Sequence, residues 1–517
     1  MIRKVVLFFV LLTALNFPFP GYGAEPAEPA GIADAARNRD MATVRSLLKP
    51  GIDASVVNAF GYDGSAALHW VVLVDDIDTA KLLLAAGADA KLANRLGVTP
   101  LAIASTNGNE EMIRLLVKAG ADTNALDSVG EPPLWAAVRS GSLNAVKALV
   151  DNNASLVFKD SAQQTTLMLA VREDHPDIVR FLVDKGADVN AKTRTGQTPG
   201  WVLPNSVPGF GHGVGIVRGG LPERGSRYLI PGGLTPLLYA ARDGRTESAK
   251  ILLAAGADLN QTDPNGITPL LMSITNNHVE TAKFLIERGS DINVVDWYGR
   301  TPLWAAVEAR NMDVDNSTFK NGVDRAPVLD VIKVLLDKGA NPNARTKETP
   351  PIRRFILPTT GSLEWVDFTG MTPFLFAARA GDVTVMKLLL AHGADPKIPT
   401  FGGTTALMTA AGINWVVDQT YDEGQPALLE AVKLCFDLGM NVNDANTMGL
   451  TAIHGAANRG SDDIIKYLVE KGAKLDAKDK EQRTPLNWAE GVFLATHPAE
   501  PKPSSIALIK KLLDTQK

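Results

Sequence analysis

Apolar and polar positions alternate along this chain with a fixed period of 33 residues between Ala66 and Thr198. In each period a short apolar segment is followed by a polar turn, a second apolar segment and a polar arm. The period returns after each interruption, at Thr235, Thr268 and Thr301, at Thr372 and Thr405, and at Thr451 and Thr484. A repeat of about 20–50 residues is typical of stacked supersecondary units that bury one another's apolar faces.

The unit that contains Thr268 shows the predicted elements most clearly. Thr268 is suited to cap a helix because its hydroxyl can accept a first-turn amide, and Pro269 fits the first helical position. We expect a first helix over about 269–275 and a second over about 279–288, which Gly289 ends in the left-handed conformation. The residues of the second helix that should face the stack are Ala282, Phe284, Leu285 and Ile286.

Three phrases recur in these units: Thr-Pro-Leu at the first helix, Leu-Leu in the second, and then Gly-Ala-Asp-x-Asn. Together they resemble the ankyrin repeat, over about residues 32–517 and about twelve units. The resemblance implies an all-α solenoid of helix-turn-helix units with short hairpin arms and a face that binds another macromolecule. His69 and His454 stand at the family's structural His position. Trp135, Trp201 and Trp304 replace it elsewhere.

The first 24 residues differ in kind from the rest. Arg3 and Lys4 precede the apolar run Val5–Leu15, and small residues follow it. This arrangement is typical of a cleaved export signal, and the run is too short to span a bilayer permanently. We expect residues 1–24 to be a signal peptide, 25–31 a linker and 32–517 a single ankyrin-repeat solenoid. The protein would then be periplasmic or secreted, in the exported bacterial branch of the family.

Charge and cysteine content narrow the range of partners. Without Arg3 and Lys4 the chain has 50 basic and 57 acidic residues, a net charge of −7, which argues against nucleic acid as a partner. The single Cys435 cannot form an internal disulfide, and it lies at a core position of its unit. An exported chain without disulfides is compatible with a bacterial periplasm.

Four insertions interrupt the period. Two lie in arms, at about 200–233 and 347–368, and two lie within helix pairs, at about 311–327 and 413–425. Long loops in compact proteins are often functional, so the arm insertions are candidate binding elements. The alternative is that they cover apolar edges of the array. The candidate partner-binding residues that they contribute are Trp201, Arg218, Arg224, Arg227, Arg353 and Arg354.

A row of arginines occupies the end of the first helix in several units: Arg139, Arg172, Arg242 and Arg379, with Arg459 one position further on. Stacking would align them on the concave face, where they would favour an acidic partner surface or an anionic polymer. The alternative is that each cation simply stabilises the end of its helix. Glu308 takes the equivalent place in its unit and interrupts the row.

Aromatic residues fall into two groups. Trp70, Tyr239, Phe376 and Trp488 lie four or five residues into first helices, where packing between stacked helices is the expected role. Trp297 and Tyr298 lie at an arm tip, where we expect little to bury them, and are candidate aromatic anchors for a partner.

The sequence contains none of the motifs that carry catalysis. Its seven histidines form no metal-binding motif, and the glycine-rich stretch 209–215 lacks the Lys and Ser or Thr of a phosphate loop. Asp residues after Gly-Ala recur with the period because the turn needs them. We therefore expect no catalytic residues, no metal and no cofactor.

These observations favour a non-catalytic scaffold in the bacterial cell envelope that binds another protein through its concave face and arm insertions. Two alternatives stay open: an enzyme or enzyme subunit whose site is formed by the two arm insertions, and a structural envelope spacer. The sequence identifies neither the partner nor the oligomeric state.

Overall fold

The computed structural model of the chain describes residues 31–61, 63–195, 232–311, 325–348, 368–415, 423–492 and 500–515. These residues form 25 helices and no β-strand, apart from an isolated antiparallel bridge between Lys159 and Thr165. The chain divides into two compact units, Met1–Arg194 and Thr195–Lys517. We call them unit 1 and unit 2, and each is described by itself. A single array across both units stays a prediction.

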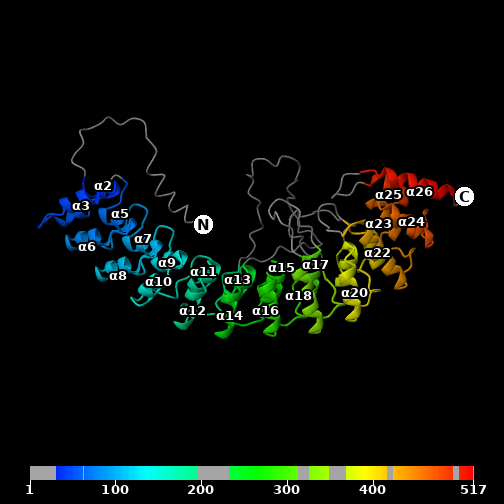
Figure 1. Cartoon of the computed structure of the whole chain (residues 1–517), viewed down its shortest axis with the longest axis horizontal. Coiled ribbons are helices and arrows are strands. Elements are labelled where there is room, and N and C mark those ends of the chain that lie inside the picture. Colours follow the sequence, from blue (N-terminus) through cyan, green and yellow to red (C-terminus); the bar gives the residue numbers. More distant parts are fainter. Residues whose placement is uncertain are drawn as a thin grey trace, which may run out of the picture. The chain divides into compact units, whose positions relative to one another are not determined.

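Unit 1 consists of helix pairs that follow one another along the chain (Figure 1). Its first helices are α2 (Ile32–Arg37), α5 (Ala67–Leu73), α7 (Pro100–Asn107), α9 (Pro133–Ser140) and α11 (Thr166–Arg172). Its second helices are α3 (Met41–Leu47), α6 (Ile77–Ala85), α8 (Glu110–Lys118), α10 (Leu143–Val150) and α12 (Pro176–Asp184). A further short helix, α4 (Ala54–Val57), lies in the first arm and was not expected from the sequence.

Unit 2 repeats the same order of elements (Figure 1). Its first helices are α13 (Pro236–Arg242), α15 (Pro269–Thr275), α17 (Pro302–Arg310), α19 (Pro373–Ala380), α21 (Ala406–Ala411), α23 (Ala452–Arg459) and α25 (Pro485–Gly491). Its second helices are α14 (Thr246–Ala254), α16 (Val279–Glu287), α18 (Arg325–Asp337), α20 (Val383–Ala391), α22 (Gln425–Asp437), α24 (Asp462–Glu470) and α26 (Pro503–Thr515).

The core of each unit lies between neighbouring helix pairs. Each first helix packs against its own second helix and against the first helices of the adjacent pairs in the same unit. The expected core aromatics are confirmed as buried: Trp70, Tyr239, Phe376 and Trp488. Cys435 is also fully buried, and burial raises the pKa of its thiol, as expected for an inert core cysteine.

Threonine caps begin most of the first helices, as the sequence predicts. The hydroxyl of Thr268 accepts the amide of Leu271 at 3.2 Å, and the residue next to it is Pro269 at the first helical position. The same bond recurs in both units, at Thr99, Thr165, Thr235, Thr301, Thr372, Thr405 and Thr484. Each cap satisfies one of the amides that a helix start leaves without a partner.

The arms are built from turns held by carboxylates and amides. In one of them, Asp127 Oδ1 accepts the amides of Val129 at 3.0 Å and Glu131 at 2.9 Å. Asn94, Asp160, Asp263, Asn446 and Asp479 bind the equivalent amides in their own arms. The aspartates after Gly-Ala likewise bind an amide two residues on, which confirms their predicted structural role: Asp89, Asp122, Asp188 and Asp258.

Asparagine side chains connect each arm to the next. Asn124 Oδ1 accepts the amide of Ser155 at 2.8 Å, and its Nδ2 donates to the carbonyl of Asn153 at 3.1 Å. Asn58, Asn343 and Asn443 make the same pair of bonds, and Asn260 and Asn293 make the first of the two. We call this set the asparagine ladder. It ties neighbouring repeats together within each unit, because every bond joins residues about one repeat apart.

The two histidines at the family's position are buried and hydrogen-bonded. The amide of Ala66 donates to His69 Nδ1 at 3.2 Å, so the proton lies on Nε2, which is 3.1 Å from the carbonyl of Val98. The amide of Thr451 donates to His454 Nδ1 at 3.1 Å. Burial lowers the pKa of both imidazoles below its ordinary value. Protonation of Nδ1 would place a second N–H opposite the backbone N–H that donates to it, so the neutral imidazole is favoured.

These histidines predict an acid-sensitive contribution to stability. A folded-state pKa below the unfolded one gives stability that is present above the unfolded pKa, about 6.5, and is lost as the pH falls. We expect the free energy of unfolding to decrease between pH 7.5 and 5.5, by at most about 1.4 kcal/mol per pH unit for each histidine.

The variants H69N and H454N test this prediction, because Asn487 already makes the equivalent bond, accepting the amide of Thr484 at 3.0 Å. Denaturant unfolding at each pH should show a shallower pH dependence in either variant and the shallowest in the double variant. A double variant with the wild-type slope would contradict the assignment.

Candidate functional site

Buried charge is concentrated in unit 2. Among the described residues, all nine Asp, Glu, Lys and Arg side chains that are buried lie between 263 and 479: Asp263, Asp296, Arg300, Glu308, Arg310, Arg379, Asp382, Arg459 and Asp479. Burying an ion costs free energy unless it is paired or hydrogen-bonded, so charge of this kind marks a specialised part of a protein. This part of unit 2 is the candidate site.

The two predicted arginines of unit 1 are half-buried and engaged within the chain. Arg139 pairs with Glu131, which lies eight residues earlier at the base of its arm. Arg172 makes the equivalent contact with Gln164, from Nη1 to Oε1 at 3.2 Å, and a second one with Glu173 at 3.1 Å. Both guanidinium groups therefore have partners in the same repeat, which reduces the positive potential expected of this row.

In unit 2 the same positions carry the reverse charge pair. Arg300 takes the place of Glu131, and Glu308 takes the place of Arg139, with 3.4 Å between their charged groups. Arg300 also donates from Nε to Asp296 at 2.7 Å. Burial lowers the pKa of Arg300, but Glu308 and Asp296 more than offset this, so it lies above its ordinary value. The pair eight residues apart is thus kept in this repeat, but the acidic and the basic residue have exchanged positions.

Arg242, the third predicted residue of the row, forms a two-bond ion pair with its neighbour. Its Nε and Nη2 donate to the two carboxylate oxygens of Asp243, both at 2.8 Å. The guanidinium also lies 4.6 Å from the ring centre of Tyr239. The bond to Asp243 raises the pKa of Arg242. The row is therefore largely neutralised at this position too.

Arg379 corrects the expectation of an exposed row, because only 4% of its surface is exposed. Its Nε donates to the carbonyl of Asn414 at 2.7 Å, and its guanidinium stacks on Phe368 and Phe376 at 5.0 and 5.4 Å from their ring centres. Arg459 is buried as well, at 7% exposed, and lies 5.2 Å from the ring centre of Trp415. Phe376 lies on the same helix as Arg379, whereas Trp415 follows α21 and so comes from the repeat before that of Arg459.

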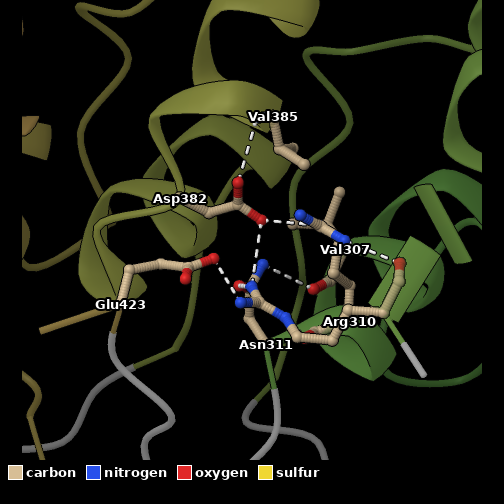
Figure 2. A network of polar contacts seen from close by, with 7 residues as sticks. Val307, Arg310, Asn311, Asp382, Val385 and Glu423 are labelled. Atoms are coloured by element: carbon tan, nitrogen blue, oxygen red, sulfur yellow. Dashed lines mark hydrogen bonds and ion pairs between the residues drawn. The ribbon is translucent and has the colours of Figure 1, made fainter. Parts of the chain in front are cut away.

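Asp382 is the centre of a second buried network (Figure 2). Its Oδ2 accepts from Arg310 Nε at 2.8 Å and from Arg325 Nη2 at 3.4 Å, while its Oδ1 caps α20 by accepting the amide of Val385 at 3.2 Å. Arg325 also pairs with Glu423, 98 residues along the chain. Arg325 and Glu423 are the first described residues after the segments 312–324 and 416–422. The network therefore joins the ends of both intra-repeat insertions to the helix pair between them.

The two predicted aromatic anchors have opposite environments. Trp297 is 43% exposed, in accord with its expected place at an arm tip. Tyr298 is only 4% exposed, so the expectation that little buries it was wrong. Its carbonyl accepts the amide of Lys347 from the next arm at 2.7 Å, and Arg300 lies 5.6 Å from its ring centre. Burial raises the pKa of Tyr298.

Sequence reasoning missed the aromatic residue that is most exposed at these tips. Phe401 is 60% exposed, and the guanidinium of Arg345 lies 4.2 Å from its ring centre. Arg345 is fixed by bonds to two carbonyls, of Gly370 at 3.1 Å and of Pro399 at 2.7 Å. The sequence could have indicated it by its position, because Phe401 stands two residues before Gly403, as Trp297 stands two before Gly299.

The tips of unit 2 are joined into a continuous edge by backbone hydrogen bonds. Trp297 donates to Asn265 at 2.9 Å, Phe401 to Thr369 at 2.9 Å, and the intervening arms are joined by the bonds Lys347 to Tyr298 and Gly370 to Thr346. We call this set, continued by Thr447 to Gly402 and Lys480 to Met448, the arm-tip edge. Gly299 permits the close approach, because a Cβ there would lie 2.7 Å from the amide nitrogen of Lys347.

Several predictions fall on residues outside the described part of the chain. These are the signal peptide 1–24, most of the linker and of the four insertions, and the candidate partner-binding residues Trp201, Arg218, Arg224, Arg227, Arg353 and Arg354. They stay predictions. Among the described residues, His, Cys, Asp and Glu form no cluster that could hold a metal ion. The helices of this part of the chain include none with the length and apolar character that crossing a membrane requires.

Comparison with known proteins identifies the family. The sequence profile "Ankyrin repeats (3 copies)" matches residues 32–127, 119–193, 237–346 and 422–491, and "Ankyrin repeat" matches 369–401. The chain belongs to the ankyrin-repeat family. Ankyrin repeats generally mediate protein–protein interaction, and proteins of this family are typically non-catalytic. The all-α repeat solenoid that the sequence predicts is thereby confirmed.

Individual relatives share the repeats over limited lengths. The ankyrin chain is 37% identical over 81 residues to the Notch-regulated ankyrin repeat-containing protein of Xenopus laevis, which is 16% of this chain and 71% of that protein. It is 29% identical over 171 residues to Alpha-latrocrustotoxin-Lt1a of Latrodectus tredecimguttatus, 33% of this chain but only 10% of the toxin. A Putative ankyrin repeat protein FPV230 of Fowlpox virus is 25% identical over 175 residues, 30% of this chain and 82% of that protein.

The Asp382 network predicts a large effect on the stability of unit 2. The variant D382N keeps a side-chain acceptor for the amide of Val385 but leaves two guanidinium groups without their shared carboxylate. Removing one partner of a buried ion pair costs about 3–5 kcal/mol. We expect a loss of this size in the free energy of unfolding, measured by denaturant titration.

The matched control for this prediction is E430Q, which removes an exposed carboxylate of unit 2 that pairs with Lys387 at 3.0 Å. Exposed pairs contribute about 0–1 kcal/mol, so this variant should unfold almost as the wild type does. Equal effects of the two substitutions would show that burial of Asp382 does not matter to stability.

Proposed function

We propose that this ankyrin protein is a non-catalytic scaffold that binds another protein through the arm-tip edge and the adjacent first-helix face of unit 2. The observation that carries the proposal is the exposure of two large aromatic side chains, Trp297 and Phe401, on one hydrogen-bonded edge. Exposed aromatic residues in a polar surround are typical of protein interaction sites, and they contribute much of the affinity at such sites.

The rigidity of the edge supports this role. Backbone bonds hold successive tips in register, and Arg345 fixes one face of Phe401 while more than half of the residue stays exposed. A surface whose side chains are already ordered loses little conformational entropy when a partner binds. Arg345 and Lys347 add positive charge between the two rings, which favours a partner with an acidic surface.

The site of action that we propose is the bacterial cell envelope. The charged, apolar and small-residue order of residues 1–24 supports export to the periplasm or medium. A fusion of residues 1–24 to a reporter enzyme that is active only outside the cytoplasm should be active in a bacterial host. Replacement of Val5, Leu7 and Leu11 by Asp should abolish that activity, and an unaffected reporter would contradict export by this segment.

The binding proposal is tested by the double variant W297S/F401S. An aromatic anchor at the centre of an interface contributes about 2 kcal/mol or more, so the loss of one should lower the affinity for the physiological partner about 30-fold, and the double variant should lose more than that. The partner is first isolated with the wild-type chain from envelope extracts, and its Kd is then measured by interferometry with each purified variant.

The control is V157S, which removes a side chain that is 83% exposed in unit 1. It should bind the partner with the wild-type Kd, and circular dichroism should show the same helix content in all three chains. An unchanged Kd for W297S/F401S would remove the arm-tip edge from the binding surface.

A further inference from the structure

Three successive arms of unit 2 carry residues at equivalent positions. The side chains of Asp296, Thr346 and Thr400 each accept the amide of the residue before the next Thr cap, at 2.8, 3.0 and 3.0 Å. The residues that flank these three are therefore equivalent as well. They are Val295, Arg345 and Pro399 on one side, and Trp297, Lys347 and Phe401 on the other. We call these six residues the three-arm patch.

The three-arm patch consists of an apolar arm, a basic arm and a second apolar arm. Val295, Trp297 and Phe401 are 41%, 43% and 60% exposed. Lys347 is exposed too, and Arg345 is half-buried. Because backbone bonds join each arm to the next, positive charge is held between two apolar surfaces in a fixed order.

Arg345 is held in one orientation by its surroundings. Its Nε and Nη2 donate to the carbonyls of Gly370 at 3.1 Å and Pro399 at 2.7 Å, and its guanidinium lies 4.2 Å from the ring centre of Phe401. Gly370 leaves room for this arrangement, because a Cβ there would lie 2.8 Å from Arg345 Nη2. A guanidinium has its N–H donors in one plane, and no described residue accepts from the two on Nη1 of Arg345. A planar edge with fixed donors is thus left for a ligand.

The two cations of the three-arm patch also differ from the predicted basic row in their electrostatic surroundings. Arg242 of that row pairs with Asp243 at 2.8 Å. Within the part of the chain that the structure describes, neither Arg345 nor Lys347 has a carboxylate within ion-pair distance, and Glu348, next in sequence, pairs with neither. A carboxylate that arrives between the two apolar arms therefore gains two cations without displacing a partner of either.

We propose that the three-arm patch binds an extended segment of the protein partner in which one acidic residue lies between two apolar residues. The inference rests on the proposed function and deepens it, because it names the chemistry that the arm-tip edge recognises. The carboxylate accepts from Nη1 of Arg345 and is attracted by Lys347. The apolar side chains pack on Trp297 and Phe401, which act as the anchors of the segment.

The spacing of the segment follows from the geometry of the repeat. Stacked helices are about 10 Å apart, so the first and the last of three successive arms are separated by roughly 20 Å. An extended chain advances about 3.3 Å per residue, so the acidic residue lies about three positions from each apolar one. An acidic segment without such apolar neighbours does not satisfy the patch.

The experiment selects peptides from a displayed library of random dodecapeptides on the full-length chain. We expect the selected peptides to carry Asp or Glu between apolar residues at the spacing given above. On R345Q/K347Q the apolar residues should still be enriched and the acidic one should not. The control R288Q should select the same peptides as the wild type. It removes another exposed arginine of unit 2 beside a phenylalanine, since Arg288 lies 5.1 Å from the ring centre of Phe284.

One selected peptide is then synthesised with its acidic residue and, separately, with the corresponding amide, and both Kd values are measured by fluorescence anisotropy. A charge-assisted pair with a fixed guanidinium should favour the acidic peptide about tenfold or more on the wild type. R345Q should remove that difference. The comparison on the wild type involves no variant, so it decides the question even where R345Q disturbs the arm. Equal Kd values for the two peptides there would contradict the proposal.

The remaining outcomes separate this inference from the proposed function. Selection of apolar peptides without an acidic residue, lost in W297S/F401S, would overturn the pattern and leave the arm-tip edge as a binding surface. Acidic peptides without apolar neighbours, or equally tight binding of dextran sulfate, would point to an anionic polymer and would also overturn it. Failure to select any peptide would overturn it too, whereas the Kd of the isolated partner for W297S/F401S would still decide the proposed function.

Discussion

Every repeat of this chain depends on its neighbours to bury its apolar faces. A first helix of six to nine residues is too short to be stable alone in water, and it gains stability by packing on the first helices beside it. The asparagine ladder adds polar contacts with the same one-repeat spacing. Side chains that face adjacent repeats are thus constrained, whereas turns and arms can accept inserted residues without loss of the core.

The places where the period breaks follow from this constraint. In the sequence both intra-repeat insertions fall between a first and a second helix, and Asp382 lies in the short turn of the repeat between them. Arg325 and Glu423, at the ends of these insertions, meet across that turn. The buried network therefore compensates for two interrupted turns with long-range ion pairs. Such a network has a high cost in desolvation, and among the described residues of unit 1, whose turns are short, no Asp, Glu, Lys or Arg is buried.

Local signals in the sequence were sufficient to predict the repeated part of the fold. The Thr caps, the Pro that follows most of them and the Gly that ends the second helices act within a few residues, and the period shows which faces are apolar. The first helix 269–275 was predicted with its observed bounds, and the second ends one residue earlier than expected, at Glu287. The burial of Trp70 followed from the same periodicity.

The candidate site was less accessible to such reasoning, because contacts between repeats decide exposure. Trp297 and Tyr298 are adjacent in sequence, yet only the second is covered by the next arm, through the bond from Lys347. Arg379 and Arg242 occupy equivalent positions, and each lies against the aromatic residue three positions before it, but only Arg379 also lies against Phe368. Phe368 stands four residues before Thr372, the place that Trp297 and Phe401 have in their own repeats, yet it is buried and they are exposed. No rule based on one repeat could have separated these cases.

The difference between the two units suggests how a scaffold of similar repeats can become specific for one binding partner. In unit 1 the arginines at the ends of first helices pair with residues of the same repeat, as Arg139 pairs with Glu131. Such partly exposed pairs contribute little to stability, so a substitution there has a small effect. In unit 2 some charged side chains are buried and contact other repeats, as Arg310 contacts Asp382 and Arg459 contacts Trp415, so each of these positions depends on a residue of another repeat. Such dependence makes substitution costly and fixes the geometry of these side chains, and a surface fixed in this way loses little conformational entropy when a partner binds. A specific binding surface is therefore more readily formed in the repeats that depart from the 33-residue period.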